Sequence, residues 1–199
     1  MCTSYRVEAT GAQLTKRFGA SPPPGWTPAA GVVVGTAAPV LIAAPERRFS
    51  LLRFGLKPSW AGEDAKTAPN ARAESLADKP YFRDAFRLRR CLVPAAAWLE
   101  RPKRGADKSP RRLALADGAL FAFAGVWEPG CFAVVTVEPN ALVRAIHDRM
   151  PALLAPGDEA AWLDPKTPPS RLAELLRPYP AERLSCRHDE ASPQGDLFG

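Results

Sequence analysis

Residues 120–137 read LFAFAGVWEPGCFAVVTV, and this stretch decides the fold class. Within it, Leu120–Gly125 and Phe132–Val137 have the apolar density of strands in a packed sheet, and Leu113–Ala116 precedes them with the same character. Similar patterns predict strands at Gly31–Thr36, Pro39–Ala43, Phe49–Phe54, Cys91–Val93 and Ala96–Leu99. Helical spacing is limited to Thr10–Phe18, Tyr81–Leu88, Asn140–His147, Ala160–Leu163 and Ser170–Leu176. Many short strands with few helices between them predict one α+β domain, mainly an antiparallel, barrel-like β-sheet with flanking short helices.

Length and composition bound the domain organisation. The chain has 199 residues, 46% of them hydrophobic, which is enough for one sizeable core. We expect a domain over residues 2–184 and a polar, flexible tail over residues 185–199. No run of about 18 apolar residues predicts a membrane span, and no secretory signal is visible. We therefore expect a cytoplasmic protein, and nothing indicates more than a monomer.

The cysteines do not form a metal-binding pattern. Cys91, Cys131 and Cys186 are widely spaced without a C-x-x-C pair, and His147 and His188 are the two histidines. A metal site is therefore not expected, no cofactor is implied, and reduced thiols are the simplest interpretation. Cys91 and Cys131 lie in apolar runs and are expected in the core.

Cys2 differs from the other cysteines because of its position. If Met1 is removed, the chain begins with a residue that carries both a free α-amine and a thiol. The amine can condense with an aldehyde to an imine, and the thiol can then close a five-membered thiazolidine ring. The same pair is suited to N-terminal-nucleophile hydrolysis, in which the amine serves as the base for the thiol. By position alone, an accident of the second codon is the simpler explanation.

The positive charge of the chain is concentrated in one window. The net charge is +6, yet residues 79–112 hold eleven basic and three acidic residues, so this window carries +8 and the remainder −2. Such a concentration is typical of proteins that bind a phosphate backbone. A solvated basic face is an equally good interpretation from charge alone.

Five segments, taken in order, carry a resemblance to a known family. They are Cys2 near the start, then Gly55–Trp60, Pro69–Glu74, Arg90–Glu100 and Ile146–Pro151, which contain "NARAE", "RCLVP" and "HDRMP". This set resembles the SOS-response-associated peptidase family, from residue 2 to about Leu163. Members of that family shield abasic sites in single-stranded DNA by covalent linkage to the N-terminal cysteine. The resemblance implies a DNA-damage protein associated with the nucleoid, with abasic single-stranded DNA as its partner.

The resemblance also assigns roles to individual residues. It implies catalysis by Cys2, Asn70, Glu100 and His147, and DNA contact by Pro58, Trp60, Arg72, Arg149 and Arg6. Glu100 would take a proton from the Cys2 amine, and His147 would exchange protons with the sugar hydroxyl. Arg72 would hold the phosphate beside the lesion, and Trp60 with Pro58 would stack on neighbouring bases.

Each of these residues also has a structural alternative. Glu100 alone would usually be a surface carboxylate at a strand end, and His147 a helix-terminal side chain that interacts with the helix dipole. Asn70 and Arg72 could form a capped turn and a salt bridge, and Trp60 could belong to the core.

The chain departs from the family pattern in several places. The family usually opens with Met-Cys-Gly-Arg and an aromatic residue, whereas this chain has Thr3 and Ser4, so the early arginine is missing or displaced to Arg6. Phe54 stands where tryptophan is common, and Arg101 follows Glu100 in place of tryptophan. These changes bring the local DNA contact of the opening segment into question, while the residues assigned to catalysis all remain.

The tail contains a second motif. Residues 194–198 read QGDLF, which resembles the pentapeptide by which bacterial replication and repair proteins bind the sliding clamp. Leu197 and Phe198 would enter an apolar pocket, with Gln194 and Asp196 completing the motif. A chance match, with the apolar pair folded back on the domain, is the alternative.

Three functions follow from these observations. The first is reversible thiazolidine cross-linking to abasic sites, with strand cleavage by β-elimination as a related lyase outcome. The family name implies a peptidase as well, and only Met1 precedes Cys2. The second is an N-terminal-nucleophile thiol hydrolase that acts on amides and does not need the basic window. The third is a non-covalent adaptor between DNA and the clamp.

Overall fold

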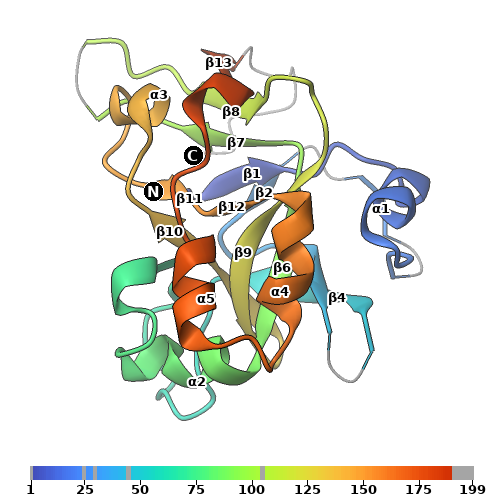
Figure 1. Cartoon of the computed structure of the whole chain (residues 1–199). Coiled ribbons are helices and arrows are strands. Elements are labelled where there is room, and N and C mark those ends of the chain that lie inside the picture. The colour runs from blue at the N-terminus through green and yellow to red at the C-terminus, as the bar shows by residue number, and fades with distance from the viewer. Residues whose placement is uncertain (1, 24–25, 29–30, 44–45, 104–105, 190–199) are drawn as a thin grey trace.

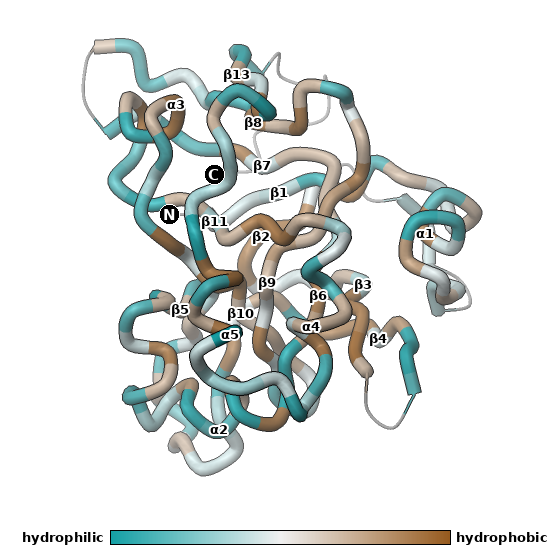
Figure 2. The backbone as a smooth tube through the Cα atoms, in the orientation of Figure 1, coloured by the Kyte–Doolittle hydropathy of each residue, from teal (hydrophilic) through white to brown (hydrophobic). Residues whose placement is uncertain are grey.

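The computed structural model describes residues 2–23, 26–28, 31–43, 46–103 and 106–189. Two sheets make up most of this region, and short helices lie around them (Figure 1). Hydrophobic residues follow the central strands, and hydrophilic residues follow the loops and the outer turns of the helices (Figure 2). This arrangement confirms the α+β class and the mainly antiparallel, barrel-like sheet. Within the described ranges, no helix is both long and apolar enough to span a membrane.

Five strands close into a barrel. They are β3 (Ala37–Ile42), β4 (Arg48–Phe54), β6 (Arg90–Ala95), β9 (Phe121–Glu128) and β10 (Cys131–Val137). Each pairs with two neighbours in the order β10-β4-β3-β6-β9, and β9 pairs again with β10, which completes the ring. Gly125 in β9 permits close packing at this point, because a Cβ atom there would lie 2.8 Å from the Sγ atom of Cys91. Five of the expected strands thus form a single closed barrel.

Short strands extend the barrel on the side of the candidate site. β5 (Asn70–Arg72) pairs with β10 in parallel, β11 (Met150–Pro151) pairs with β10 antiparallel, and β12 (Leu153–Leu154) pairs with β9. The pairing of β10 with β4 is also parallel. The sheet is therefore mixed where the sequence predicts antiparallel strands, because segments that are distant in sequence reach β10 from the same direction.

The second sheet is antiparallel and packs against the barrel. Its order is β13 (Leu184–His188), β8 (Arg111–Leu115), β7 (Ala97–Glu100), β1 (Ser4–Arg6) and β2 (Val32–Val33). Tyr5 and Trp98 are fully buried on its inner face. The Tyr5 ring meets Phe54 and Phe123 edge-on at 5.7 and 5.9 Å, so an aromatic cluster joins this sheet to the barrel.

Helices cover the outside of the sheets. They are α1 (Gly11–Phe18), α2 (Pro80–Leu88), α3 (Ala141–Arg144), α4 (Glu159–Leu163) and α5 (Pro169–Leu175), with 3-10 turns η1 (Ala73–Ser75), η2 (Pro156–Asp158) and η3 (Ala181–Arg183). Thr10 caps α1 through a capping box with Gln13. In Figure 1, α2 lies at the end of the molecule opposite β7, β8 and β13.

Two expected boundaries differ from the structure. The helix predicted over Asn140–His147 ends at Arg144, although Asn140 does cap it by accepting a hydrogen bond from the Val143 amide at 2.9 Å. The chain must turn there to bring Met150 into β11. The flexible tail predicted from residue 185 overlaps β13, which pairs with β8. Leu184 and Cys186 of this strand face the interior. Ordered structure therefore continues to Asp189, and the QGDLF motif lies outside the described residues.

Candidate active site

Cys2 lies two residues before β1 and is buried. Its residue is 1% exposed, and its Sγ atom donates to the Ser4 carbonyl at 3.8 Å. The Asn70 side chain crosses from β5 and donates from Nδ2 to the Cys2 carbonyl at 3.0 Å. Because β5 is fixed by parallel pairing with β10, the barrel holds the backbone of Cys2 in place. Asn70 Oδ1 is buried and has no hydrogen-bond partner among the described residues.

A cavity of about 300 Å³ opens beside this segment. Its lining comes from β1, from β7 and the loop after it, and from the segment before β11. The residues that line it are Thr3, Ser4, Leu99, Glu100, Arg101, Lys103, Pro110 and His147. The cavity thus gathers one carboxyl group, one imidazole and two basic side chains next to Cys2.

Glu100 is the buried acid of this cavity. It ends β7 with 3% exposure, and burial raises the pKa of its carboxyl to about 7. A carboxyl with this pKa can give or accept a proton near neutral pH, which is the property required of a general acid–base catalyst. The sequence leaves a surface position open as an alternative for Glu100, and the structure places it in the interior.

Burial also raises the pKa of the Cys2 thiol, and the negative charge of Glu100 adds to this effect. The thiol is therefore protonated at neutral pH, and the influence of Glu100 shows that the two groups are close. A protonated thiol does not compete with an adjacent amine for an electrophile. The arrangement favours the amine as first nucleophile and requires a base before the sulfur can react.

His147 faces the same cavity from the segment after α3. It is 6% exposed, and burial lowers the pKa of its imidazole, so the neutral form prevails at neutral pH. Its Nδ1 atom lies 3.0 Å from the Arg149 amide nitrogen, which donates to it, and 2.8 Å from the Asp148 carboxylate. Nδ1 can accept from the amide when unprotonated or donate to Asp148 when protonated. The site can therefore hold His147 in either protonation state.

Lys103 and Asp148 are functional candidates that the sequence interpretation missed. Lys103 Nζ lies 2.8 Å from Asp148 Oδ1, and the Lys103 amide donates to the Ile146 carbonyl at 3.1 Å. These bonds join the loop after β7 to the segment that carries His147. One sequence signal could have identified them: Lys103 lies close to Glu100 in the sequence, and Asp148 directly follows His147.

Trp60 stands on the surface rather than in the core. It is 63% exposed, and its ring meets Tyr81 edge-on at 6.0 Å. The Tyr81 hydroxyl donates to the Lys66 carbonyl at 2.7 Å, which ties α2 to the loop that carries Trp60. Pro58 is buried beneath this loop, and its carbonyl accepts from the Ala61 amide at 3.0 Å. The result is a fixed, exposed aromatic surface.

The three arginines expected to contact DNA lie in different environments. Arg72 is exposed at the end of β5, and its side chain forms no hydrogen bond or ion pair with any residue that the structure describes. Arg149 is 7% exposed and donates to both carboxylate oxygens of Glu74, at 3.0 and 2.8 Å, and to Glu138 at 3.1 Å.

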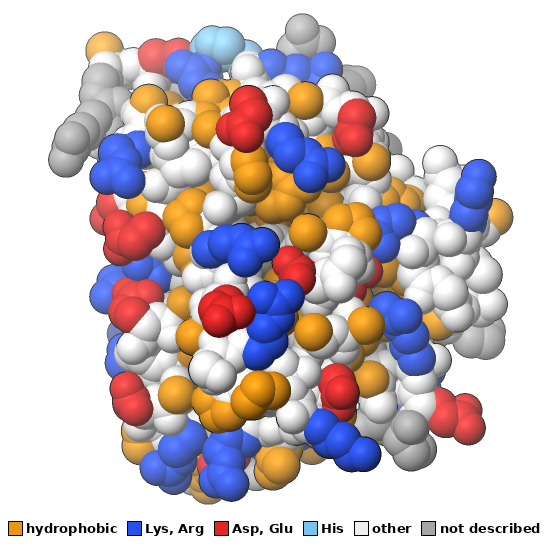
Figure 3. Space-filling view, viewed as in Figure 1, with side chains coloured by type: hydrophobic (Ala, Val, Ile, Leu, Met, Phe, Trp, Pro, Cys, Tyr) orange, Lys and Arg blue, Asp and Glu red, His pale blue; other side chains and the backbone are white. Residues whose placement is uncertain are grey.

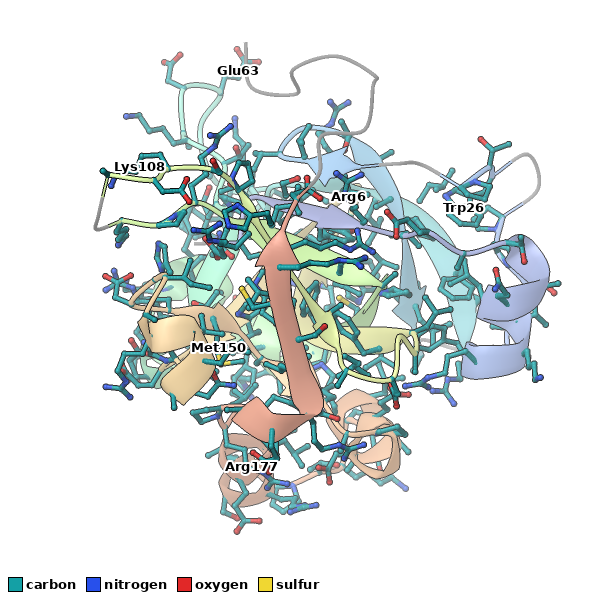
Figure 4. The ribbon with its side chains drawn as sticks, turned by 90° about the horizontal axis from the view of Figure 1, so that it is seen from above. Arg6, Trp26, Glu63, Lys108, Met150 and Arg177 are labelled. Carbon is teal, nitrogen blue, oxygen red and sulfur yellow. The ribbon has the colours of Figure 1, made fainter. Side chains whose placement is uncertain are left out.

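Arg6 is also 7% exposed and has its guanidinium 2.8 Å from the carboxylate of Asp189, just beyond β13 (Figure 4). Of the three arginines, Arg72 is therefore the one whose guanidinium faces solvent. Arg6 and Arg149 hold segments of the site together through ion pairs with residues distant in sequence.

Comparisons with known proteins bear on the family and the fold of the chain. The family model described as "SOS response associated peptidase (SRAP)" matches residues 1–190. The chain is 40% identical over 152 residues to the abasic site processing protein YoaM of Bacillus subtilis, covering 70% of this chain and 67% of that protein. It is 31% identical over 169 residues to the abasic site processing protein HMCES of Xenopus tropicalis, covering 67% of this chain and 50% of that protein.

Solved structures share the fold. A protein from Bacteroides thetaiotaomicron superposes with a TM-score of 0.83 at 24% identity, covering 94% of this chain and 91% of that chain. A protein from Bordetella bronchiseptica also gives a TM-score of 0.83, at 25% identity, covering 96% of this chain and all of the other. The architecture described above is therefore common to several bacterial proteins.

Proposed function

The chain belongs to the SOS response associated peptidase family, and we propose that it binds single-stranded DNA at an abasic site and links to it covalently through Cys2. The observation that carries this proposal is the placement of the buried Cys2 next to residues of the cavity that Glu100 lines, within electrostatic range of that buried carboxyl, whose pKa is raised to about 7. An α-amine has an ordinary pKa near 7.7 to 8, so Glu100 is matched to accept its proton.

The chemistry would proceed in two steps after removal of Met1. The neutral amine of Cys2 attacks the aldehyde carbon of the ring-opened sugar, and loss of water gives an imine. The thiol then adds to the imine carbon, its proton passes to the nitrogen, and a thiazolidine forms. The adduct therefore contains all atoms of the protein and the DNA except one molecule of water.

The surrounding residues have distinct parts in this scheme. Glu100 accepts the proton of the Cys2 ammonium group and later relays the proton of the thiol. His147 exchanges a proton with the sugar hydroxyl during ring opening. Asn70 holds the Cys2 carbonyl and so orients the amine, Arg72 binds a flanking phosphate, and Trp60 stacks on a neighbouring base.

The decisive experiment mixes the purified protein with single-stranded DNA that carries one abasic site. Mass spectrometry first establishes that Met1 is absent, and a denaturing gel then separates any adduct after heating. We expect a heat-stable band whose mass equals the sum of the two components less one water. Absence of this band, with Met1 removed, would overturn the proposal.

Two further activities belong to the same site. Cleavage of the strand by β-elimination would follow from the imine if ring closure were slow, and it would appear as a shortened DNA product. We place the peptidase activity at the bond before Cys2, because its cleavage creates the required amine. A thiol hydrolase is the rival function; it would act on amides and would not need the steeply salt-sensitive DNA binding that phosphate contacts produce.

We also propose that the tail binds a bacterial sliding clamp through residues 194–198. This rests on the sequence QGDLF alone, because these residues lie outside the described part of the chain. Phe198→Ala is expected to weaken binding to purified clamp at least tenfold, since it removes an apolar anchor. Surface plasmon resonance with immobilised clamp measures the change, and Glu63→Gln, at an exposed position outside the motif, serves as a control. Unchanged binding by Phe198→Ala would contradict the motif.

A further inference from the structure

β8 and β13 place two arginines opposite one another. Their register sets Arg112 opposite Arg187, whereas Arg111 lies opposite His188 and forms a hydrogen bond to its ring. Like charges directly across an antiparallel pair destabilise a sheet. We call these two strands the outer ribbon. Figure 3 shows basic side chains beside a histidine along the upper edge, where Figure 1 places β8 and β13.

Nearby acids compensate for part of this charge. Arg112 donates to both carboxylate oxygens of Glu8, at 3.1 and 2.6 Å, and Arg111 pairs with Asp107 at 2.7 Å. The Arg187 side chain is exposed and forms no hydrogen bond or ion pair with the residues that the structure describes. The Glu8 side chain is 41% exposed and that of Arg112 is 13% exposed, so an incoming phosphate would have to displace the Glu8 carboxylate to reach Arg112.

The two faces of the outer ribbon differ. Leu113 is fully buried on the inner face, whereas Arg112, Ala114, Ser185 and Arg187 alternate with it and face outward. These four outward residues line a hollow of about 460 Å³. The small side chains of Ala114 and Ser185 form its floor between the two arginines. The hollow therefore combines space with positive charge.

A straight cross-strand row connects this hollow with the active-site cavity. Ser4 lies opposite Leu99, Leu99 opposite Arg112, and Arg112 opposite Arg187. Ser4 and Leu99 line the cavity beside Cys2, and the two arginines line the hollow. Three strand spacings separate the ends of the row, which is about 14 Å. The row shares one face of the sheet: Ser4 and Leu99 are 2% and 6% exposed where they line the cavity, and Arg187 is exposed at the far end.

We propose that the sugar-phosphate backbone of the strand flanking the abasic site runs along this row, with Arg112 and Arg187 each neutralising one phosphate. This deepens the proposed function and rests on it. It also divides the basic window into two parts, because Arg83 and Arg87 lie on α2, at the opposite end of the molecule from the outer ribbon (Figure 1). The part of the basic window that lies on β8 contacts the DNA.

The test measures equilibrium binding of single-stranded DNA that carries a tetrahydrofuran analogue, which has no aldehyde. Fluorescence anisotropy over a salt series gives the slope of log K against log salt for the wild type, Arg112→Gln, Arg187→Gln and the double variant. Each substitution in the outer ribbon is expected to reduce the magnitude of the slope by about 0.7, the value for one phosphate contact on a single strand. Arg87→Gln removes the same charge from α2 and is expected to leave the slope unchanged.

DNA length and thermal stability give independent readouts. The wild type is expected to prefer long oligonucleotides over ones that end next to the analogue, and the double variant is expected to lose most of this preference. Arg187→Gln is expected to keep or raise the midpoint of thermal unfolding, because it removes a like-charge pair. A lower midpoint together with weaker binding would indicate a structural role and overturn the proposal. An unchanged slope in the double variant, or an equal loss in Arg87→Gln, would overturn it as well.

The covalent reaction separates this proposal from the proposed function. The wild type is also mixed with abasic DNA that retains its aldehyde. A covalent band together with unaltered salt slopes in the Arg112 and Arg187 variants would refute the DNA path along the outer ribbon and leave the proposed function standing. No covalent band together with reduced slopes would refute cross-linking and retain the DNA surface.

Discussion

Cys2→Ala is expected to abolish the heat-stable adduct with abasic single-stranded DNA. The alanine variant keeps the α-amine, so an imine can still form, but no sulfur is present to close the ring. The adduct should therefore disappear from heated denaturing gels, while treatment with borohydride still traps a protein–DNA species. A drop of at least 100-fold in stable adduct is the expected magnitude, since a covalent step is removed entirely.

Cys186→Ala is the matched control for this experiment. Cys186 is a half-buried free thiol on β13, and its removal leaves the amine, Glu100 and the cavity intact. It should form the adduct at the wild-type level. Equal adduct from wild type and Cys2→Ala would mean that another nucleophile reacts. Loss in both variants would point to general destabilisation, which a thermal unfolding curve would reveal.

Much of the fold follows from local sequence. Apolar runs predict the strands of the barrel, and Thr10 and Asn140 mark the starts of their helices through capping. Closure of the barrel does not follow, because it depends on β10 pairing with both β4 and β9. The parallel direction of the β4 pairing also has no local signal. β13 escapes detection because only Leu184 and Cys186 supply apolar side chains in an otherwise polar segment.

The candidate site, like the fold, can be predicted from the sequence only in part. The residue types of Cys2, Asn70, Glu100 and His147 can be chosen from the resemblance, and the structure shows how they are arranged. The burial that raises the pKa of Glu100 arises from tertiary packing and leaves no mark in the sequence. The pairing of Arg6 with Asp189 spans 183 positions, so no sequence pattern distinguishes this buried arginine from an exposed one such as Arg72.

Glu100→Gln is expected to slow cross-linking by about 100-fold, the lower range for loss of a general acid–base catalyst. Glutamine has nearly the same shape, so the cavity is retained while proton transfer is lost. In the wild type, the rate should fall as the pH drops below about 7, because the Glu100 carboxyl becomes protonated. The variant should lose the Glu100 contribution near pH 7 and keep only the decline from protonation of the Cys2 amine, whose ordinary pKa is about 7.7 to 8. Rates from quenched time points on denaturing gels, over pH 5 to 9, measure both effects, and Glu63→Gln, which changes a carboxylate at an exposed site, is the control.

The same substitution should stabilise the fold above neutral pH. The pKa of Glu100 is raised from 4.5 in the reference state to about 7 in the folded protein, so folding favours the protonated form. Its contribution to stability is fully present below about pH 4.5 and is lost as the pH rises through 7. At pH 8 the buried charge costs up to about 3 kcal/mol, which Glu100→Gln removes. Urea unfolding at pH 8 and pH 4 should therefore show a more stable variant only at the higher pH. A variant that is slower yet no more stable at pH 8 would mean that Glu100 is not held as a buried, destabilised carboxylate, and the acid–base role would lose its physical basis.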